Sequence, residues 1–485
     1  MRKQKSLKIN AVLNLLRTLM GLLFPIVTFP YSSRVLGPEG TGTVQYIQSF
    51  VSYFVMIAML GIGTYGLREC AKVRDNDLEL SKLAKEIFII NIISTIISYI
   101  LLFIAYIFFS DLKQYKSILF VVSLNIIFNT IGINWLFGAV EDYLYITIRS
   151  IIFPVIGLIL LFVLVKDKND TFQYALLTII TSVGSNILNL IYSRKYINLF
   201  KKTTIELKKH LKPIFILFGN VVAVNIYSVL DSIMLGKISG VEQVGIYNAA
   251  TKINKIVVSL VKSVGSVITP RMSNYIENDK ESYNRLLSTT CDIYCMFSIP
   301  CVVGLSFLAK PIINLFCGHE FFGSIIIMHI ISLIIFFISL GGFFMDQIFI
   351  PRRKDKYTMV AVVSGAIINF TLNLILIPKY YALGAAIATV IAEFVVFFIS
   401  FLLAFKILKS DMFKIFKNLW QYIVSTILMF FILFALSLLF KIHNHLYLII
   451  SVLCSIFIYF AFLIILRNPI IIKLIKSLNE RTIKQ

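Results

Sequence analysis

Apolar stretches of about 20 residues follow one another along this chain, each long enough to cross a hydrocarbon core of roughly 30 Å as a helix. Lipid cannot hydrogen-bond an exposed backbone, so such stretches are confined to helices or closed barrels, and helices fit this length. Of the 485 residues, 58% are hydrophobic and 14% are charged, well below the roughly one-quarter charged residues of a soluble domain. We therefore expect an all-α, polytopic membrane protein.

The apolar stretches predict about fourteen transmembrane helices. They lie near residues 9–33, 42–66, 85–109, 116–138, 143–165, 172–193, 212–236, 244–269, 286–308, 321–345, 357–378, 381–405, 418–440 and 446–466. The first stretch follows a basic start and resembles a signal peptide, but it continues through two prolines without a small-residue cleavage site. We interpret it as a retained first span.

Positive charge alternates from one predicted loop to the next. Roughly 32 Lys and Arg lie at the two ends and in every second loop, whereas about 9 lie in the intervening loops. Lys and Arg accumulate on the cytoplasmic side, so this places both termini in the cytoplasm of a bacterial inner membrane and requires an even number of spans. The net charge of +22 is thus explained by orientation and membrane lipid contact, and we expect no nucleic-acid partner.

Several classes of function are disfavoured by what the loops lack. The longest loops run to only about 20 residues, too short for a folded domain. The sequence has no phosphate-binding loop, HExxH motif, nucleophile elbow or CxxC pair. Its six cysteines are scattered without metal-ligand spacing, so we expect no catalytic residue, no cofactor and no metal site. The sequence does not predict an enzyme.

The chain carries an internal repeat. Residues 34–46 read RVLGPEGTGTVQY, and residues 234–247 read MLGKISGVEQVGIY. An offset of six spans, an even number, relates the halves by an axis along the membrane normal. We expect two six-helix lobes, residues 1–200 and 201–410, related by a pseudo-twofold axis, followed by two accessory helices and a cytoplasmic tail in residues 411–485. A substrate would bind between the lobes.

The eighth predicted span carries three lysines on one face. An ionisable side chain at mid-membrane is costly unless it faces a wet or paired interior, so it marks a functional site by default. At about 100° per residue, six polar positions share an arc of roughly 80°. They are Asn248, Lys252, Lys255, Ser259, Lys262 and Ser266. Snorkelling to the interface could explain Lys252 but not Lys255 and Lys262 together.

Three other spans are polar in the same way, as the repeat requires. Candidate cavity residues are Asn14 and Arg17 on the first span, Gln48 on the second and Asn225 on the seventh. Among the acids, Glu393 lies deep in the twelfth span and Asp231 lies in the seventh. We hypothesise that Asp231 pairs with a lysine of the eighth span and that Glu393 carries a coupling proton or Na⁺; a static hydrogen bond is an equal alternative for Glu393.

These motifs resemble a known family. Residues 29–42, FPYSSRVLGPEGTG, resemble the signature after the first span of the Wzx-like polysaccharide flippases, a branch of the multidrug/oligosaccharidyl-lipid/polysaccharide exporter superfamily. Residues 231–236 and 245–250 resemble its counterpart in the second half. The resemblance implies alternating access and export of undecaprenyl-diphosphate-linked oligosaccharides from the cytoplasmic to the outer leaflet. It also implies coupling to H⁺ or Na⁺ and allows an assembly with a polysaccharide polymerase and a chain-length regulator.

Other functions stay open at this point. A flippase for lipid II or teichoic-type precursors would suit the same cationic cavity. A multidrug or cation antiporter is less compatible, because three cavity lysines repel cationic drugs. A membrane glycosyltransferase or polymerase is disfavoured by the bare outer loops, and a channel or scaffold explains neither the repeat nor the buried charge.

Overall fold

The structure is a computed structural model that describes residues 7–199, 204–225, 229–439, 445–473 and 475. Some further side chains, mostly within residues 7–23 and 220–225, are not described. The described residues contain helices, turns and loops but no strand, so the all-α prediction is confirmed. They divide into two compact units, Met1–Gly245 and Ile246–Gln485. The expected lobe boundaries and pseudo-twofold axis stay predictions.

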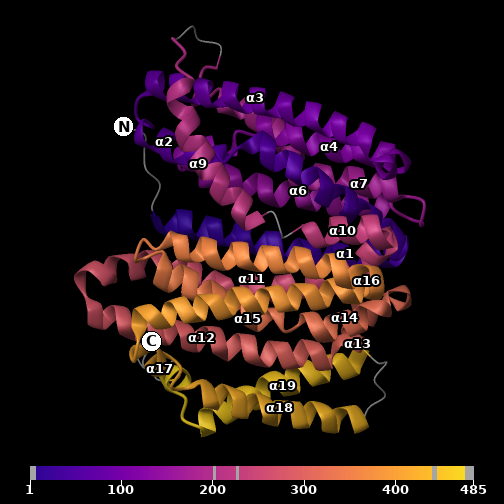
Figure 1. The fold of residues 1–485 in the computed structure, drawn as a ribbon, viewed down its shortest axis with the longest axis vertical. Helices are drawn as coiled ribbons and strands as arrows, with labels where there is room; N and C mark the ends of the chain where they lie inside the picture. The colour runs from indigo at the N-terminus through magenta and orange to yellow at the C-terminus, as the bar shows by residue number, and fades with distance from the viewer. Residues whose placement is uncertain (1–6, 200–203, 226–228, 440–444, 474, 476–485) are drawn as a thin grey trace. The chain divides into compact units, whose positions relative to one another are not determined.

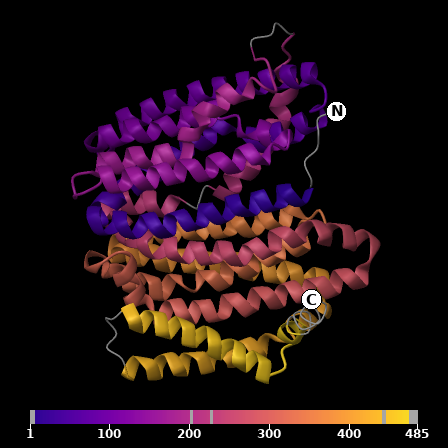
Figure 2. The same cartoon turned by 180° about the vertical axis from the view of Figure 1, so that it is seen from behind.

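The first unit is built around the long helix α1, which packs against α3, α4 and α6 (Figures 1 and 2). Its helices are α1 (Leu7–Met59), α2 (Ile62–Lys72), α3 (Asp77–Phe108), α4 (Lys116–Ile131), α5 (Asn134–Ala139), α6 (Tyr143–Leu164), α7 (Thr171–Ile179), α8 (Ser185–Ser193), α9 (Lys208–Asn225) and α10 (Leu230–Ser239). A π-helical turn, Ile180–Gly184, joins α7 to α8. Helix α11 (Val241–Asn278) begins in this unit and continues into the second.

In the second unit, α12 packs against α15 and α18. The helices are α12 (Lys280–Phe307), α13 (Ala309–Phe316), α14 (Gly323–Ile331), α15 (Ile334–Phe344), α16 (Asp355–Leu408), α17 (Asp411–Ile415), α18 (Leu419–Leu439) and α19 (His445–Ile465). A π-helical turn, Met345–Phe349, extends α15. The predicted accessory pair corresponds to α18 and α19, and the Tyr459 hydroxyl of α19 donates a hydrogen bond to the Met296 carbonyl of α12 at 2.8 Å.

Eleven helices in the described residues are long and apolar enough to span a membrane. The count of fourteen is not confirmed, because two predicted pairs of spans are each counted as one long helix, although a kink separates the two arms of that helix. Helix α1 is kinked at Gly37, where φ is 68°, and α16 is kinked at Tyr381, where φ is 52°. The predicted seventh span corresponds to α9 and α10, neither of which is among the eleven.

Small polar side chains are buried between the helices, whereas large apolar side chains are exposed on the outside, as expected for lipid as solvent. On α3 the buried positions include Asn91, Ser94 and Ser98, whereas the exposed ones include Ile93, Ile96 and Ile100. The Asn91 amide and the Ser94 hydroxyl both donate to the Ala58 carbonyl, at 2.8 and 2.5 Å. Small hydroxyl and amide side chains therefore hold α3 to α1 while isoleucines face outward.

Helix starts follow ordinary capping chemistry outside the apolar stretches. Asn76 caps α3 by accepting the backbone N–H groups of Leu78 and Glu79, and Asp279 caps α12 by accepting the N–H of Ser282 at 3.0 Å. Each cap satisfies donors that have no partner in the first helical turn. These caps fix where α3 and α12 begin.

Candidate functional site

Three predicted cavity residues lie outside the part of the chain whose side chains are described. Asn14 and Arg17 fall on α1, and Asn225 is the last residue of α9. Their backbones are helical, as predicted. Their roles stay predictions.

Two predicted residues lie inside the first unit. The Gln48 amide on α1 donates to the Thr178 hydroxyl of α7 at 2.7 Å. Asp231 is buried on α10, close enough to Tyr53 of α1 for its charge to act on the Tyr53 hydroxyl. Both side chains thus take part in polar contacts between helices of one unit.

The polar face of α11 is only partly buried. Asn248 and Lys252 are half-buried and both make polar interactions, and Lys255 is exposed. Lys262 is half-buried and lies against Gly342 of α15, where a Cβ atom would come within 3.2 Å of Nζ. Its charge acts on Asp346, in the π-helical turn after α15. The structure therefore places Lys262 of α11 near Asp346, in the turn that extends α15.

The same turn is fastened to α11 by a second set of contacts. The Gln347 amide donates to the Gly265 carbonyl at 3.2 Å and to the Thr269 hydroxyl at 3.0 Å. The Gln347 carbonyl accepts the Tyr283 hydroxyl of α12 at 2.8 Å. A widened helical turn often marks a functional position, and here it joins α11, α12 and α15 beside Lys262.

Glu393 is buried within the hairpin formed by the two arms of α16, with 6% of its surface exposed. Gly365 of the first arm packs against Ala392 and Val396 of the second, which places the second arm's buried face toward the first. The first arm also buries Asn369 and Asn373, whose side chains are hydrogen-bonded to each other at 3.2 Å. An ionisable acid in such a place takes part in polar interactions.

One half-buried cation within a helix was not predicted from the sequence. Arg149 of α6 donates hydrogen bonds to Ser185 at 3.3 Å and Asn186 at 3.2 Å, both on α8, and to Asn134 of α5. Asn189 of α8 donates to the Gly132 carbonyl at 2.8 Å. The signal was present, because Arg149 lies within an apolar predicted span and the rule that singled out Arg17 applies to it equally.

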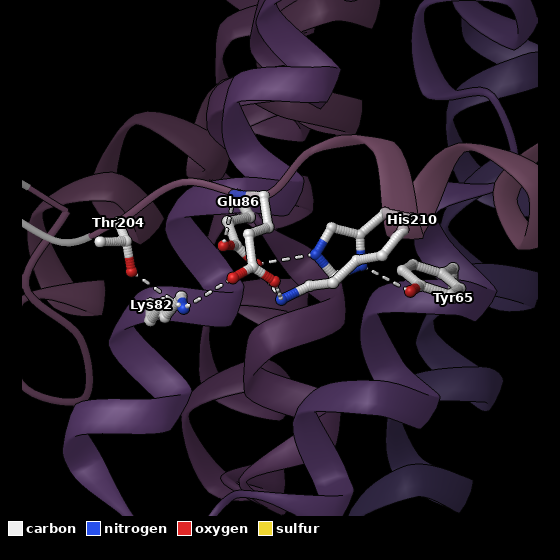
Figure 3. Close-up of polar contacts among 7 residues, drawn as sticks. Tyr65, Lys82, Glu86, Thr204 and His210 are labelled. Carbon is white, nitrogen blue, oxygen red and sulfur yellow. Dashed lines mark hydrogen bonds and ion pairs between the residues drawn. The ribbon is translucent and has the colours of Figure 1, made fainter.

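A second missed group surrounds Glu86 (Figure 3). His210 was expected in a loop, but it lies buried near the start of α9, with its Nε2 2.8 Å from Glu86 Oε2. Its Nδ1 is 2.6 Å from the Tyr65 hydroxyl of α2. Glu86 also accepts the Glu206 backbone N–H at 2.9 Å and lies 3.2 Å from Lys209 Nζ. We call Tyr65, Glu86, Glu206, Lys209 and His210 the Glu86 cluster.

The Glu86 cluster joins three helices of the first unit, α2, α3 and α9. The side chains of Glu86 and His210 are 1% and 3% exposed, whereas Lys209 and Glu206 are half-exposed or more. A buried carboxylate is tolerated only when it is paired and hydrogen-bonded. The cluster meets that condition with donors from two side chains and one backbone N–H, so it fixes the start of α9 against α3.

In the second unit, a cavity of about 780 Å³ lies beside α12. Its lining combines Arg285, Asp292, Asn418 and Lys473 with apolar residues such as Phe297. The Asn418 amide donates to Asp292 Oδ2 at 2.9 Å. The Asn468 amide donates to Gln421 Oε1 at 2.6 Å, so polar contacts continue through the helices that follow.

In the described residues no group of three or more His, Cys, Asp or Glu is placed to hold a metal ion. The polar groups above are cations, acids and amides held between membrane helices. Such intramembrane charges line the substrate and ion pathways of transporters. Apolar helices that hold such groups between them define a multi-span membrane protein.

Comparison with known proteins identifies the family. The sequence profile of the family described as "Polysaccharide biosynthesis protein" matches residues 7–276, and the MatE profile matches residues 213–375. The chain therefore belongs to the polysaccharide biosynthesis protein family, as a Wzx-like member of the multidrug/oligosaccharidyl-lipid/polysaccharide exporter superfamily. The resemblance seen in the sequence is confirmed.

Individual relatives agree with this family. A protein of Escherichia coli (strain K12) named "Putative O-antigen transporter" is 25% identical over 377 residues, covering 76% of this chain and 90% of that one. Lipid II flippase MurJ of Thermosipho africanus is 31% identical over 136 residues, covering 27% of this chain and 28% of that one. A structure of lipid II flippase MurJ in an inward closed conformation has the same fold, with a TM-score of 0.76 and 18% identity over 95% of this chain and 99% of that one.

Proposed function

We propose that this protein moves undecaprenyl-diphosphate-linked oligosaccharide units from the cytoplasmic to the outer leaflet of a bacterial inner membrane by alternating access. The observation that carries the proposal is the lysine face of α11, where Lys252, Lys255 and Lys262 share one side of a helix within an apolar predicted span. The name of the Escherichia coli relative supports a saccharide cargo. Charge alternation supports cytoplasmic termini.

A lipid-linked saccharide poses two physical problems that such a face would solve. Its sugars and diphosphate are too polar to cross lipid unaided, whereas its isoprenoid tail can stay in the bilayer. Attraction between unit charges rises several-fold when water is excluded, so lysines in a low-dielectric interior would hold a diphosphate strongly. We assign Arg17 and the three lysines to the diphosphate, and Asn14, Gln48, Asn225 and Asn248 to the sugars.

Energy for transport would come from an ion gradient. Glu393 and Asp231 are buried acids, and a buried acid that binds and releases H⁺ or Na⁺ can couple the ion's movement to a change of conformation. We propose these two residues as the coupling sites. A polysaccharide polymerase and a chain-length regulator are the protein partners we expect.

The test uses cells that lack their own flippase and make a surface polysaccharide. We expect the double variant Lys255→Ala with Lys262→Ala to abolish surface polymer at normal protein level. The matched control is Lys406→Ala with Lys417→Ala, which removes two exposed lysines outside the lysine face. Unchanged polymer in the first variant would overturn the cavity assignment.

A second candidate cargo is lipid II. The 31% identity to lipid II flippase MurJ over 136 residues favours it, and its diphosphate would suit the same lysines. Expression of this chain in cells depleted of their lipid II flippase separates the two. Restored growth would assign lipid II, and restored surface polymer without restored growth would assign the oligosaccharide.

A further inference from the structure

A second cavity lies in the first unit, beside α3. It measures about 660 Å³ and is lined by α3, by the end of α8 and by the chain that follows α8. The lining residues are Lys85, Phe88, Ile89, Ile92, Leu190, Ser193, Arg194, Ile197, Asn198 and Leu199. All of them belong to one unit, so the cavity is complete within it.

Charge in this cavity has one sign. Lys85 and Arg194 are both lining residues, and no Asp or Glu is among the ten. Glu86, the next residue after Lys85, is buried in the Glu86 cluster, where it is hydrogen-bonded to His210. Among the described lining residues the charged groups are therefore two cations, and the carboxylate of Glu86 is hydrogen-bonded to His210 and to the Glu206 backbone N–H.

The polar and apolar parts of the lining are separated along α3. Phe88, Ile89 and Ile92 follow Lys85 at spacings of three, four and seven residues, which places all four on one helix face. At 1.5 Å per residue, Ile92 lies about 10 Å along the helix from Lys85. The cavity thus has a charged end at Lys85 and an apolar side along the next two turns of α3. Ile93 and Ile96, further along α3, are exposed on the surface that we expect to face lipid.

The charged end of the cavity lies where the chain after α8 meets α3. The backbone N–H of Asn198 donates to Ser81 of α3 at 3.1 Å, so the chain after α8 is attached to α3 one turn before Lys85. Both segments belong to the stretches that were predicted as positively charged loops, around residues 67–86 and 194–212. The charged end of the cavity therefore lies at the proposed cytoplasmic surface, at the depth of lipid headgroups.

We propose that this cavity binds one anionic diacyl phospholipid of the cytoplasmic leaflet, with its phosphate between Lys85 and Arg194 and an acyl chain along Phe88, Ile89 and Ile92. Basic pockets between membrane helices on the cytoplasmic side suit such headgroups. A free phosphate would use the cations but leave the apolar stripe unoccupied, and a zwitterionic lipid would gain less from two cations. The bound lipid would brace the chain after α8 against α3.

Native mass spectrometry of the whole protein, released from nanodiscs of equal phosphatidylglycerol and phosphatidylethanolamine, tests this proposal. We expect one retained phosphatidylglycerol, and about tenfold weaker retention in the double variant Lys85→Gln with Arg194→Gln, because each removed cation weakens attraction to an anionic headgroup. Lys406→Gln with Lys417→Gln removes two exposed lysines elsewhere and should retain the lipid. No saccharide cargo is present, so the result is independent of the proposed transport.

Two competition experiments distinguish the proposed phospholipid from other occupants of the cavity. Inorganic phosphate at millimolar concentration should not displace the lipid, and equimolar undecaprenyl phosphate should not replace it. Displacement by either, equal retention in the Lys85 and Arg194 variant, or equal loss in the control would overturn the proposal. If that variant fails to fold, a photoreactive phosphatidylglycerol on the unaltered protein decides instead: labelling should fall on residues 85–92 and 190–199, and labelling elsewhere would contradict the site.

Discussion

Gly42 on α1 and Gly245 on α11 lie in direct backbone contact. A Cβ atom on Gly42 would fall 1.9 Å from the Val241 carbonyl oxygen, and one on Gly245 would fall 2.0 Å from the Pro38 carbonyl oxygen. Real Cβ atoms never approach so closely, so each position requires glycine. The two stretches that look alike in the sequence, around residues 34–46 and 234–247, therefore meet each other in the fold.

Substituting either glycine with alanine should force α1 and α11 apart. We expect Gly42→Ala and Gly245→Ala each to destabilise the protein by about 1–3 kcal/mol, the range for overpacking a close contact. Thermal unfolding of the purified protein in detergent measures this loss. Gly63→Ala is the matched control, because nothing lies within 4 Å of its Cβ position and alanine favours a helix. Equal stability of all three variants would contradict the close contact.

Within the Glu86 cluster, the buried pair of Glu86 and His210 should contribute more to the stability of the protein than the exposed ion pairs of Lys209 do. Glu86→Ala leaves buried His210 without its carboxylate partner, and breaking a buried pair costs about 3–5 kcal/mol. Tyr65→Phe removes one hydrogen bond and should cost about 1 kcal/mol. Thermal unfolding in detergent again provides the measurement.

A double-mutant comparison isolates the buried pair. The coupling between Glu86 and His210 should exceed that between Glu86 and Lys209, because Lys209 is 46% exposed and solvent screens exposed charges to about 0–1 kcal/mol. Similar coupling energies for the two pairs would show that the burial of His210 does not matter.

The sequence predicted an all-α, multi-span chain because lipid imposes a simple rule on apolar length, but the count of fourteen spans is not confirmed. It also predicted a polar face on α11, since an ionisable residue in an apolar span stands out by itself, and the role of that face as a cavity lining stays a prediction. The Glu86 cluster could not be found this way. Glu86 lies at the edge of a predicted span, and His210 is 124 residues further along the chain, so only the folded arrangement of α9 and α3 shows that they pair. Arg149 stood out by the same rule as Arg17 and could have been predicted.

Asp170 gives the loop before α7 a dependence on pH. The backbone N–H groups of Lys166 and Asp167 donate to its carboxylate at 2.8 and 3.1 Å. The hydrogen bond from Lys166, followed by that from Asp167, lowers the Asp170 pKa below its ordinary value of 3.8. The stabilisation of this loop is thus fully present above the ordinary pKa and is lost as the pH falls through the lowered one.

Hydrogen exchange of residues 164–171, corrected for intrinsic rates, checks this dependence. Protection should fall below about pH 4 in the unaltered protein, and Asp170→Ala, which has no side-chain acceptor, should have low protection at every pH. Asp279→Ala, which removes the cap of α12, should leave this segment unchanged. A fall in protection on acidification that persists in Asp170→Ala would assign the pH dependence to another group.

Glu393 distinguishes an ion-coupling site from a static helix contact. In Glu393→Gln the side chain keeps its size and can still hydrogen-bond within the α16 hairpin, but it can no longer ionise. If Glu393 carries the coupling ion, transport in this variant should lose its response to an imposed H⁺ or Na⁺ gradient. Transport is measured as the gradient-dependent appearance of lipid-linked saccharide in the outer leaflet of vesicles, with Glu320→Gln, an exposed acid, as control. A variant that folds normally and keeps its full gradient response would leave Glu393 as a structural contact, and Asp231→Asn would then be the variant that decides whether an acid of the first unit carries the ion.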